Sequence, residues 1–162
     1  MRIPLREYAF VLLLCGSTAF AKTAPLRPNH KLTPGVAAKV TAATLCAKQF
    51  HTRDERHVTE LRKKLVYEEY GIRSHQPKEY EIDHLISLEL GGSNDIKNLW
   101  PQSYVTKPWN AHVKDQLETR LHWMICHKKI TLRQAQREIA ADWIACYKRH
   151  IAPKPLSKLP PP

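Results

Sequence analysis

The sequence lacks several features that would assign it to a class at once. Its 162 residues contain no uninterrupted apolar run of about 18 or more, which excludes a multi-pass membrane protein. They contain no Cys-x-x-Cys pair, typical of structural zinc knuckles, and no His-Glu-x-x-His, typical of zinc proteases. Acidic residues are few, with 15 Asp and Glu against 26 Lys and Arg, and the net charge is +11. This excess of positive charge predicts a polyanionic partner.

The first segment has the features of an export signal. Residues 1–21 begin with the basic residues Arg2 and Arg6, continue with a short apolar stretch, and end in the small-x-small triplet 19–21. This pattern predicts a secretory signal peptide that is cut before Lys22. We therefore expect a periplasmic or secreted protein with no stable membrane insertion after cleavage.

The rest of the chain divides by composition. Residues 22–35 are rich in proline and show no periodic pattern, so they predict a linker. Residues 152–162 are also rich in proline and predict a disordered tail. Since no internal repeat is visible, one folded unit is predicted over 36–151, and we expect it to be a monomer.

Export also changes how the cysteines are interpreted. Once the signal is removed, Cys46, Cys126 and Cys146 remain, and an oxidising compartment permits one disulfide. The sequence alone does not assign the pairing. We favour Cys46–Cys126, which would tie the N-terminal segment to a later helix. Cys146 would then be a free thiol near the chain end.

Three stretches have the apolar spacing of amphipathic helices, which we interpret as core packing. The second is predicted over 110–126. The third begins with Thr131-x-x-Gln134, a capping-box pattern. The stripes are Val58, Leu61 and Leu65, ended by Gly71; Val113, Leu117, Leu121, Met124 and Ile125; and Leu132, Ala135, Ile139, Trp143 and Ile144.

Between the first and second helices the pattern changes to strands and turns. Residues 80–86 alternate polar and apolar side chains, which predicts a strand. Residues 91–95 read Gly-Gly-Ser-Asn-Asp and predict a turn or loop. Residues 98–100 predict a second, short strand that Pro101 ends. The order strand, loop, strand, helix predicts an α+β fold.

The same region carries the most specific motif of the chain. It reads Asp83-His84, then Gly-Gly-Ser-Asn-Asp at 91–95, then Asn98-Leu99. This series closely resembles the HNH endonuclease family, the ββα-metal or His-Me finger nucleases, in a branch of small secreted bacterial proteins. The resemblance covers about 79–126. It implies a small ββα-metal core with additional flanking helices.

The resemblance also implies roles for three residues in phosphodiester hydrolysis. His84 would be the general base, since an imidazole titrates near neutral pH. Asp83 would bind one divalent metal ion through a carboxylate oxygen. Asn98 would hold the loop and orient the base. The Gly-Gly pair does not have the spacing of a phosphate-binding P-loop, so it is interpreted as loop geometry.

Two further positions complete the expected site. The family's third motif residue would be Asn110 at the start of the 110–126 helix, with His112 as the alternative metal ligand. An Asn at a helix start is also a common N-cap, and the two roles compete. Lys114, one helical turn after Asn110, is the predicted contact to a nucleic-acid phosphate.

Together with the export signal and the excess of positive charge, the resemblance implies an exported, metal-dependent HNH endonuclease of low sequence specificity. DNA is the expected substrate, with RNA as a further one. Mg²⁺ is the first choice of metal, although an Asp, His and Asn site would also accept Mn²⁺, Ca²⁺ or Zn²⁺. The alternative is a non-catalytic protein that binds nucleic acid, or another polyanion, on an HNH-like scaffold.

Overall fold

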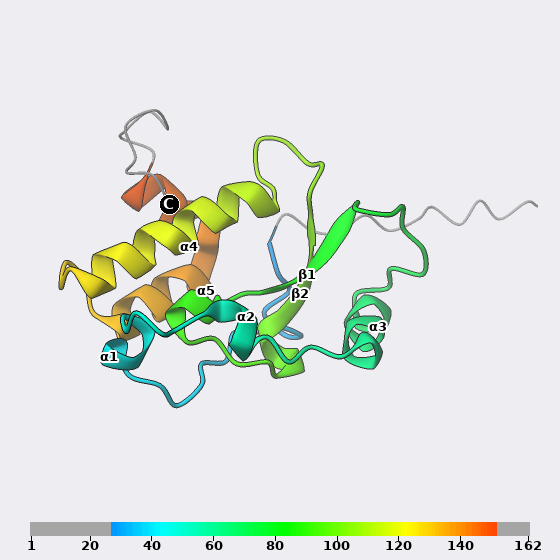
Figure 1. Cartoon of the computed structure of the whole chain (residues 1–162). Helices are drawn as coiled ribbons and strands as arrows, with labels where there is room; N and C mark the ends of the chain where they lie inside the picture. The colour runs from blue at the N-terminus through cyan, green and yellow to red at the C-terminus, as the bar shows by residue number, and fades with distance from the viewer. Residues whose placement is uncertain (1–26, 152–162) are drawn as a thin grey trace, which may run out of the picture.

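The structure, a computed structural model, describes residues 27–151, which form a mixed α+β fold (Figure 1). The predicted signal peptide and Pro-rich tail lie outside the described residues. None of the helices within 27–151 has the length and apolarity needed to cross a bilayer. The elements are α1 (Ala42–Leu45), α2 (Thr52–Glu55), α3 (Glu60–Glu69), β1 (Tyr80–His84), the 3₁₀ turns η1 (Leu88–Leu90) and η2 (Ile96–Asn98), β2 (Leu99–Ser103), α4 (Ala111–Cys126) and α5 (Leu132–His150).

The two strands form an antiparallel two-stranded sheet, and β2 is longer than predicted. The prediction that Pro101 ends the strand is wrong, because β2 continues to Ser103. Leu85 N donates to Asn98 O (2.8 Å), and hydrogen-bonded pairs alternate along an antiparallel ladder. By this alternation Pro101 lies opposite Ile82 at a pair that makes no ladder bond. Its missing N–H therefore removes nothing from the sheet.

Helices α4 and α5 lie side by side at one end of the sheet, as Figure 1 shows. Most residues of their predicted apolar stripes are buried, with Leu117, Leu121 and Ile139 fully inaccessible to solvent and Trp143 1% exposed, whereas Val113, Met124 and Leu132 are half-buried. Both helices pack on one continuous core, to which β2 contributes Trp100. Thr131 caps α5 by accepting a hydrogen bond from Gln134 N (3.1 Å), as its capping pattern predicts.

The first predicted apolar stripe is wrong, because the structure buries a different face of that helix. Leu61 and Leu65 are 68% and 42% exposed. Helix α3 instead buries Val66 and Tyr70, which are four residues apart and so share a face. The Tyr70 hydroxyl lies 2.8 Å from Thr33 Oγ1, so a polar contact helps to fix this face.

The segment predicted as a linker is part of the folded unit in its second half. Thr33 is fully buried, and its hydroxyl donates to Leu99 O (2.8 Å). Gly35 N donates to Lys97 O (3.0 Å). These bonds tie residues 29–35 to the start of β2, so the folded unit begins before the predicted boundary at 36.

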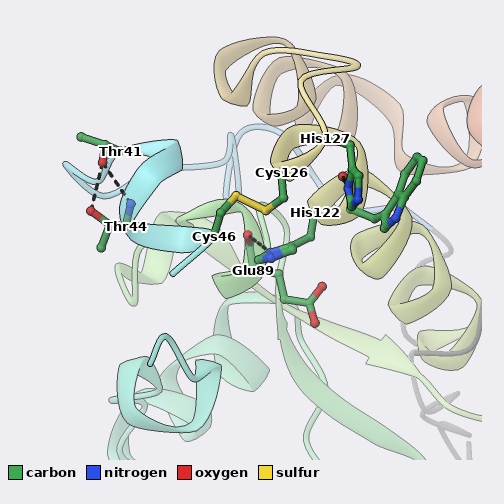
Figure 2. The surroundings of a disulfide bond; sticks show 8 residues. Thr41, Thr44, Cys46, Glu89, His122, Cys126 and His127 are labelled. Carbon is green, nitrogen blue, oxygen red and sulfur yellow. Dashed lines mark hydrogen bonds between the residues drawn. A yellow bond between two sulfur atoms is a disulfide. The ribbon is translucent and has the colours of Figure 1, made fainter. Parts of the chain in front are cut away.

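The predicted Cys46–Cys126 disulfide is confirmed (Figure 2). It joins the residue after α1 to the last residue of α4, across a sequence separation of 80. His122 lies beside it, with Nδ1 2.9 Å from Glu89 O. Cys146 is a free thiol, and it is buried in the core.

Removing this disulfide is expected to destabilise the fold strongly. Closing a loop of this length lowers the entropy of the unfolded chain by an amount worth about 4.5 kcal/mol. The double variant Cys46→Ala/Cys126→Ala should therefore melt more than about 10 °C below the wild type in a thermal scan. Cys146→Ala is the control, because it removes a thiol that is not part of the disulfide. Dithiothreitol, which reduces the disulfide, should lower the melting temperature of this variant as it lowers that of the wild type. A double variant that melts with the wild type would contradict the prediction.

Candidate active site

The ring of His84, at the end of β1, is held by one side chain. His84 Nε2 lies 3.0 Å from Asn94 Oδ1. The Asn94 amide is itself oriented by two backbone groups, because Oδ1 accepts from His57 N (3.1 Å) and Nδ2 donates to Glu55 O (2.8 Å). An amide oxygen only accepts hydrogen bonds, so Nε2 must carry the proton and Nδ1 keeps its lone pair.

Burial also sets the protonation state of His84. The residue is 1% exposed, and burial lowers its pKa below the ordinary value of 6.5, although Asn94 and the charge of Asp83 act in the opposite direction. The imidazole is therefore neutral at pH 7. Nδ1 is buried and has no hydrogen-bond partner among the described residues. A neutral ring with a fixed tautomer and a free lone pair can accept a proton.

Asn98 holds the loop between the strands, as the resemblance implies. It is fully buried, and its Nδ2 donates to Ile86 O and Ser93 O (both 2.9 Å). Its Oδ1 accepts from Ile86 N (3.0 Å) and Val36 N (3.2 Å). All these partners are backbone groups, so Asn98 acts on His84 through the loop that carries Asn94.

The Gly-Gly pair serves this loop geometry. A Cβ at Gly92 would lie 1.7 Å from Ile86 O and 2.9 Å from Asn98 Nδ2. Any side chain at this position would therefore separate Asn98 from the loop. Gly91 has a positive φ of 69°, which favours glycine for a second reason.

Asp83 precedes His84 on β1, and consecutive side chains of a strand point to opposite faces. Its Oδ2 lies 2.6 Å from Lys114 Nζ, which comes from α4. Lys114 Nζ also donates to His84 O (2.8 Å) and to Glu118 Oε1. Burial opposes the positive charge of Lys114, but Asp83 and Glu118 raise its pKa above the ordinary value.

The prediction that Lys114 contacts a nucleic-acid phosphate is wrong for this structure. Lys114 is fully buried. It precedes Leu117 and Leu121 by three and seven residues and so belongs to the inward face of α4. Its ammonium neutralises carboxylates inside the protein and does not reach the surface.

The predicted metal ligands are not brought together. Asn110 caps α4, since its Oδ1 accepts from Val113 N (3.1 Å) and its Nδ2 donates to Thr106 O (3.1 Å). The alternative ligand, His112, is exposed, and its ring lies 5.2 Å from that of Tyr104. With Asp83 paired to Lys114, these residues as placed do not fit a divalent ion.

Other groups of potential metal ligands among the described residues do not include the predicted ones either. Within residues 27–151, two groups of three His, Cys, Asp or Glu bring their ligand atoms within 4.8 Å of one another. Neither group includes Asp83, His84 or His112. The groups are Cys46, His122 and Cys126, in which the two cysteines form the disulfide, and Glu138, Cys146 and His150.

Further carboxyl groups surround the Asp83–Lys114 pair. Burial, followed by the charge of Asp83, raises the pKa of Glu81 to about 7, and the Tyr104 hydroxyl donates to Glu81 Oε2 (2.6 Å). Burial also raises the pKa values of Asp115 and Glu118. These groups retain protons more readily than exposed carboxyls, because one buried ammonium does not balance them all.

Comparison of the chain with protein-family models, with curated proteins and with solved structures gave no match. The arrangement of His84, Asn94 and Asn98 is therefore the basis on which a function can be assigned. Sequence reasoning identified His84 and Asn98. It interpreted Asn94 only as part of a turn and gave Glu118 no role.

Proposed function

We propose that this protein is an exported HNH-type endonuclease that hydrolyses nucleic-acid phosphodiester bonds, with His84 as the general base. The carrying observation is the hydrogen bond from His84 Nε2 to Asn94 Oδ1, which leaves a neutral ring with Nδ1 free to accept a proton. The order β1, Gly-Gly loop, β2, α4 supports the proposal, because a ββα order is what the resemblance implies.

The chain's own residues account for the proton transfer. Nδ1 of His84 takes a proton from a water molecule, whose oxygen attacks the phosphorus atom. The bond from phosphorus to the leaving 3′ oxygen breaks, and this oxygen takes a proton from solvent, which gives the 3′-hydroxyl and 5′-phosphate that the resemblance implies. Asn94 Oδ1 accepts from Nε2–H throughout and stabilises the ring once it is charged. The resemblance implies a divalent ion as well, but no step is assigned to it, because the predicted ligands do not meet.

Water must reach Nδ1, which is buried in this structure. The segment next to Asn94 is exposed, since α2 has no buried residue and Glu55, Arg56 and His57 all face solvent. Arg62 Nη1 ties it to the loop by donating to His57 O (3.4 Å) and Asn94 O (2.9 Å). Glu55 and His57 bond to Asn94 through backbone groups alone. The same two bonds orient Asn94, so this segment has to stay in place for Nε2 to keep its acceptor.

The surface charge supports a nucleic-acid substrate. Exposed basic side chains occur along the whole described chain, and such charge predicts binding to phosphate backbones that weakens with salt and is independent of sequence. These residues include Arg53, Arg56, Lys64, Arg73, Lys107, Lys128, Lys129, Arg133, Arg137 and Lys148.

A second candidate is the non-catalytic nucleic-acid or polyanion binding protein. The burial of His84 Nδ1 favours it, because a base that no water reaches does not act. The same basic surface would then bind the polyanion without cutting it.

Incubation with supercoiled plasmid and with RNA separates the two candidates. The wild type, with Mg²⁺, with Mn²⁺ or with EDTA, is expected to nick the plasmid. His84→Ala should leave it intact, because it removes the proton acceptor. His75→Ala is the matched control, since it removes an exposed imidazole and should keep the activity. Intact plasmid in every lane, with a gel shift at low salt, would contradict the nuclease and support the binding protein.

A further inference from the structure

The ammonium group of Lys114 lies where a metal ion would be expected beside Asp83. We infer that this ammonium is the resident cation of the Asp83 site and that the site takes no divalent metal. The inference concerns the site of the proposed function. Only the test that measures cleavage rests on that function, because metal binding can be measured independently of cleavage.

The contacts of Lys114 Nζ resemble those of a bound cation. An ammonium has three N–H donors. Nζ donates hydrogen bonds to the His84 carbonyl (2.8 Å) and to Glu118 Oε1, and it forms an ion pair with Asp83 Oδ2 at 2.6 Å. The first of these distances is only slightly longer than the 2.3–2.6 Å of calcium–oxygen bonds, and the second lies at the upper end of that range. Lys114 is fully buried, and the three oxygen atoms come from two elements, β1 (Asp83 and His84) and α4 (Glu118).

Among residues 27–151, the neighbours of Asp83 do not form a set of His, Cys, Asp or Glu ligands for a divalent ion. Asn110 uses its side-chain oxygen and nitrogen to cap α4 and to bind Thr106 O. No group of three converging His, Cys, Asp or Glu within the described part of the chain includes Asp83. A divalent ion at Asp83 would therefore have to displace the ammonium or lie directly beside another positive charge.

Paramagnetic broadening by Mn²⁺ tests the inference in the wild-type protein. Mn²⁺ bound at Asp83 would broaden the backbone amide signals of Asp83, His84 and Lys114 in a nitrogen–proton correlation spectrum. We expect these three signals to persist when Mn²⁺ is added, even if signals near exposed carboxylates weaken. Their selective loss would overturn the inference, whether or not the protein cleaves nucleic acid.

Removing the ammonium provides the converse test. In Lys114→Ala, the oxygens of Asp83, Glu118 and His84 face the position that Nζ has left. Where this variant folds, we expect Mn²⁺ to remove the Asp83 and His84 signals. If Lys114 served only to stabilise the fold, its removal would not create a site for Mn²⁺. Unchanged signals in the folded variant would count against a cation position. If it does not fold, the wild-type spectrum decides alone.

The activity arm compares cleavage with and without a chelator. We expect EDTA to leave the nicking rate unchanged within error, since the charge at Asp83 is balanced by the chain itself. Cleavage that stops in EDTA, together with Mn²⁺ broadening at Asp83, would overturn the inference. The absence of cleavage under every condition would count against the proposed function, and the Mn²⁺ spectrum would still decide whether the ammonium is the cation.

Discussion

Replacing Lys114 with methionine is expected to lower the free energy of unfolding by about 3–5 kcal/mol. The variant leaves the carboxylates of Asp83 and Glu118 in a buried position without their cation. Methionine is of similar length, so the loss of charge and not of volume dominates. Urea unfolding followed by circular dichroism measures the change. Lys129→Met, an exposed lysine, is the matched control and should stay within about 0.5 kcal/mol of the wild type.

Removing the carboxylates as well tests whether the loss of stability comes from unpaired buried charge or from misfolding. The triple variant Lys114→Met/Asp83→Asn/Glu118→Gln carries no buried charge at these positions, and we expect it to recover much of the lost stability. Lys114→Met alone should also become relatively more stable as the pH falls. Carboxyls with a raised folded-state pKa favour the fold while protonated and lose this contribution as the pH rises through that pKa. Equal midpoints for Lys114→Met and Lys129→Met would contradict the buried ion pair.

Much of the fold could be predicted because its signals are local. The stripes of α4 and α5 are long, so their helical period is easily recognised, and most of their residues are buried as predicted. Helix α5 is kinked at Asp142, where φ is −163° and ψ is 101°, which the stripe does not predict. Helix α3 has only 10 residues, and its weak stripe allowed a wrong phase. Thr33 could not be predicted as core, because its burial depends on Leu99 and Tyr70, which are distant in sequence.

The candidate site shows the same division. His84 and Asn98 lie within one continuous motif, and Asn98 makes the loop contacts that the resemblance implies. The partner of His84 was missed because Asn94 is oriented by residues 55 and 57, which lie far before it in the chain. Lys114 is predicted as a phosphate contact because it is basic and lies one helical turn after Asn110, whereas its position on the α4 stripe with Leu117 decides its burial. A lysine in an apolar stripe, with Glu118 four residues later, was the signal available.

His84→Ala should reduce the initial rate of phosphodiester cleavage by about 10²–10⁴-fold, the range that a positioned general base contributes. Plasmid nicking at substrate excess measures this rate, with His75→Ala as the control. The pH dependence follows from the burial of His84, which lowers its pKa below 6.5. The base form therefore persists at pH 6.5 and above, and the wild-type rate should fall only at more acidic pH.

Asn94→Asp tests whether this acidic limb belongs to His84. An aspartate at this position still accepts from Nε2–H, but its negative charge favours the protonated ring and should raise the pKa of His84. Protonated His84 cannot accept a proton from water, so the limb should move to higher pH while the rate at alkaline pH remains. The variant also loses the Nδ2 bond to Glu55 O, which would lower the rate equally at all pH values. A limb that stays in place in Asn94→Asp would show that a group other than His84 accepts the proton.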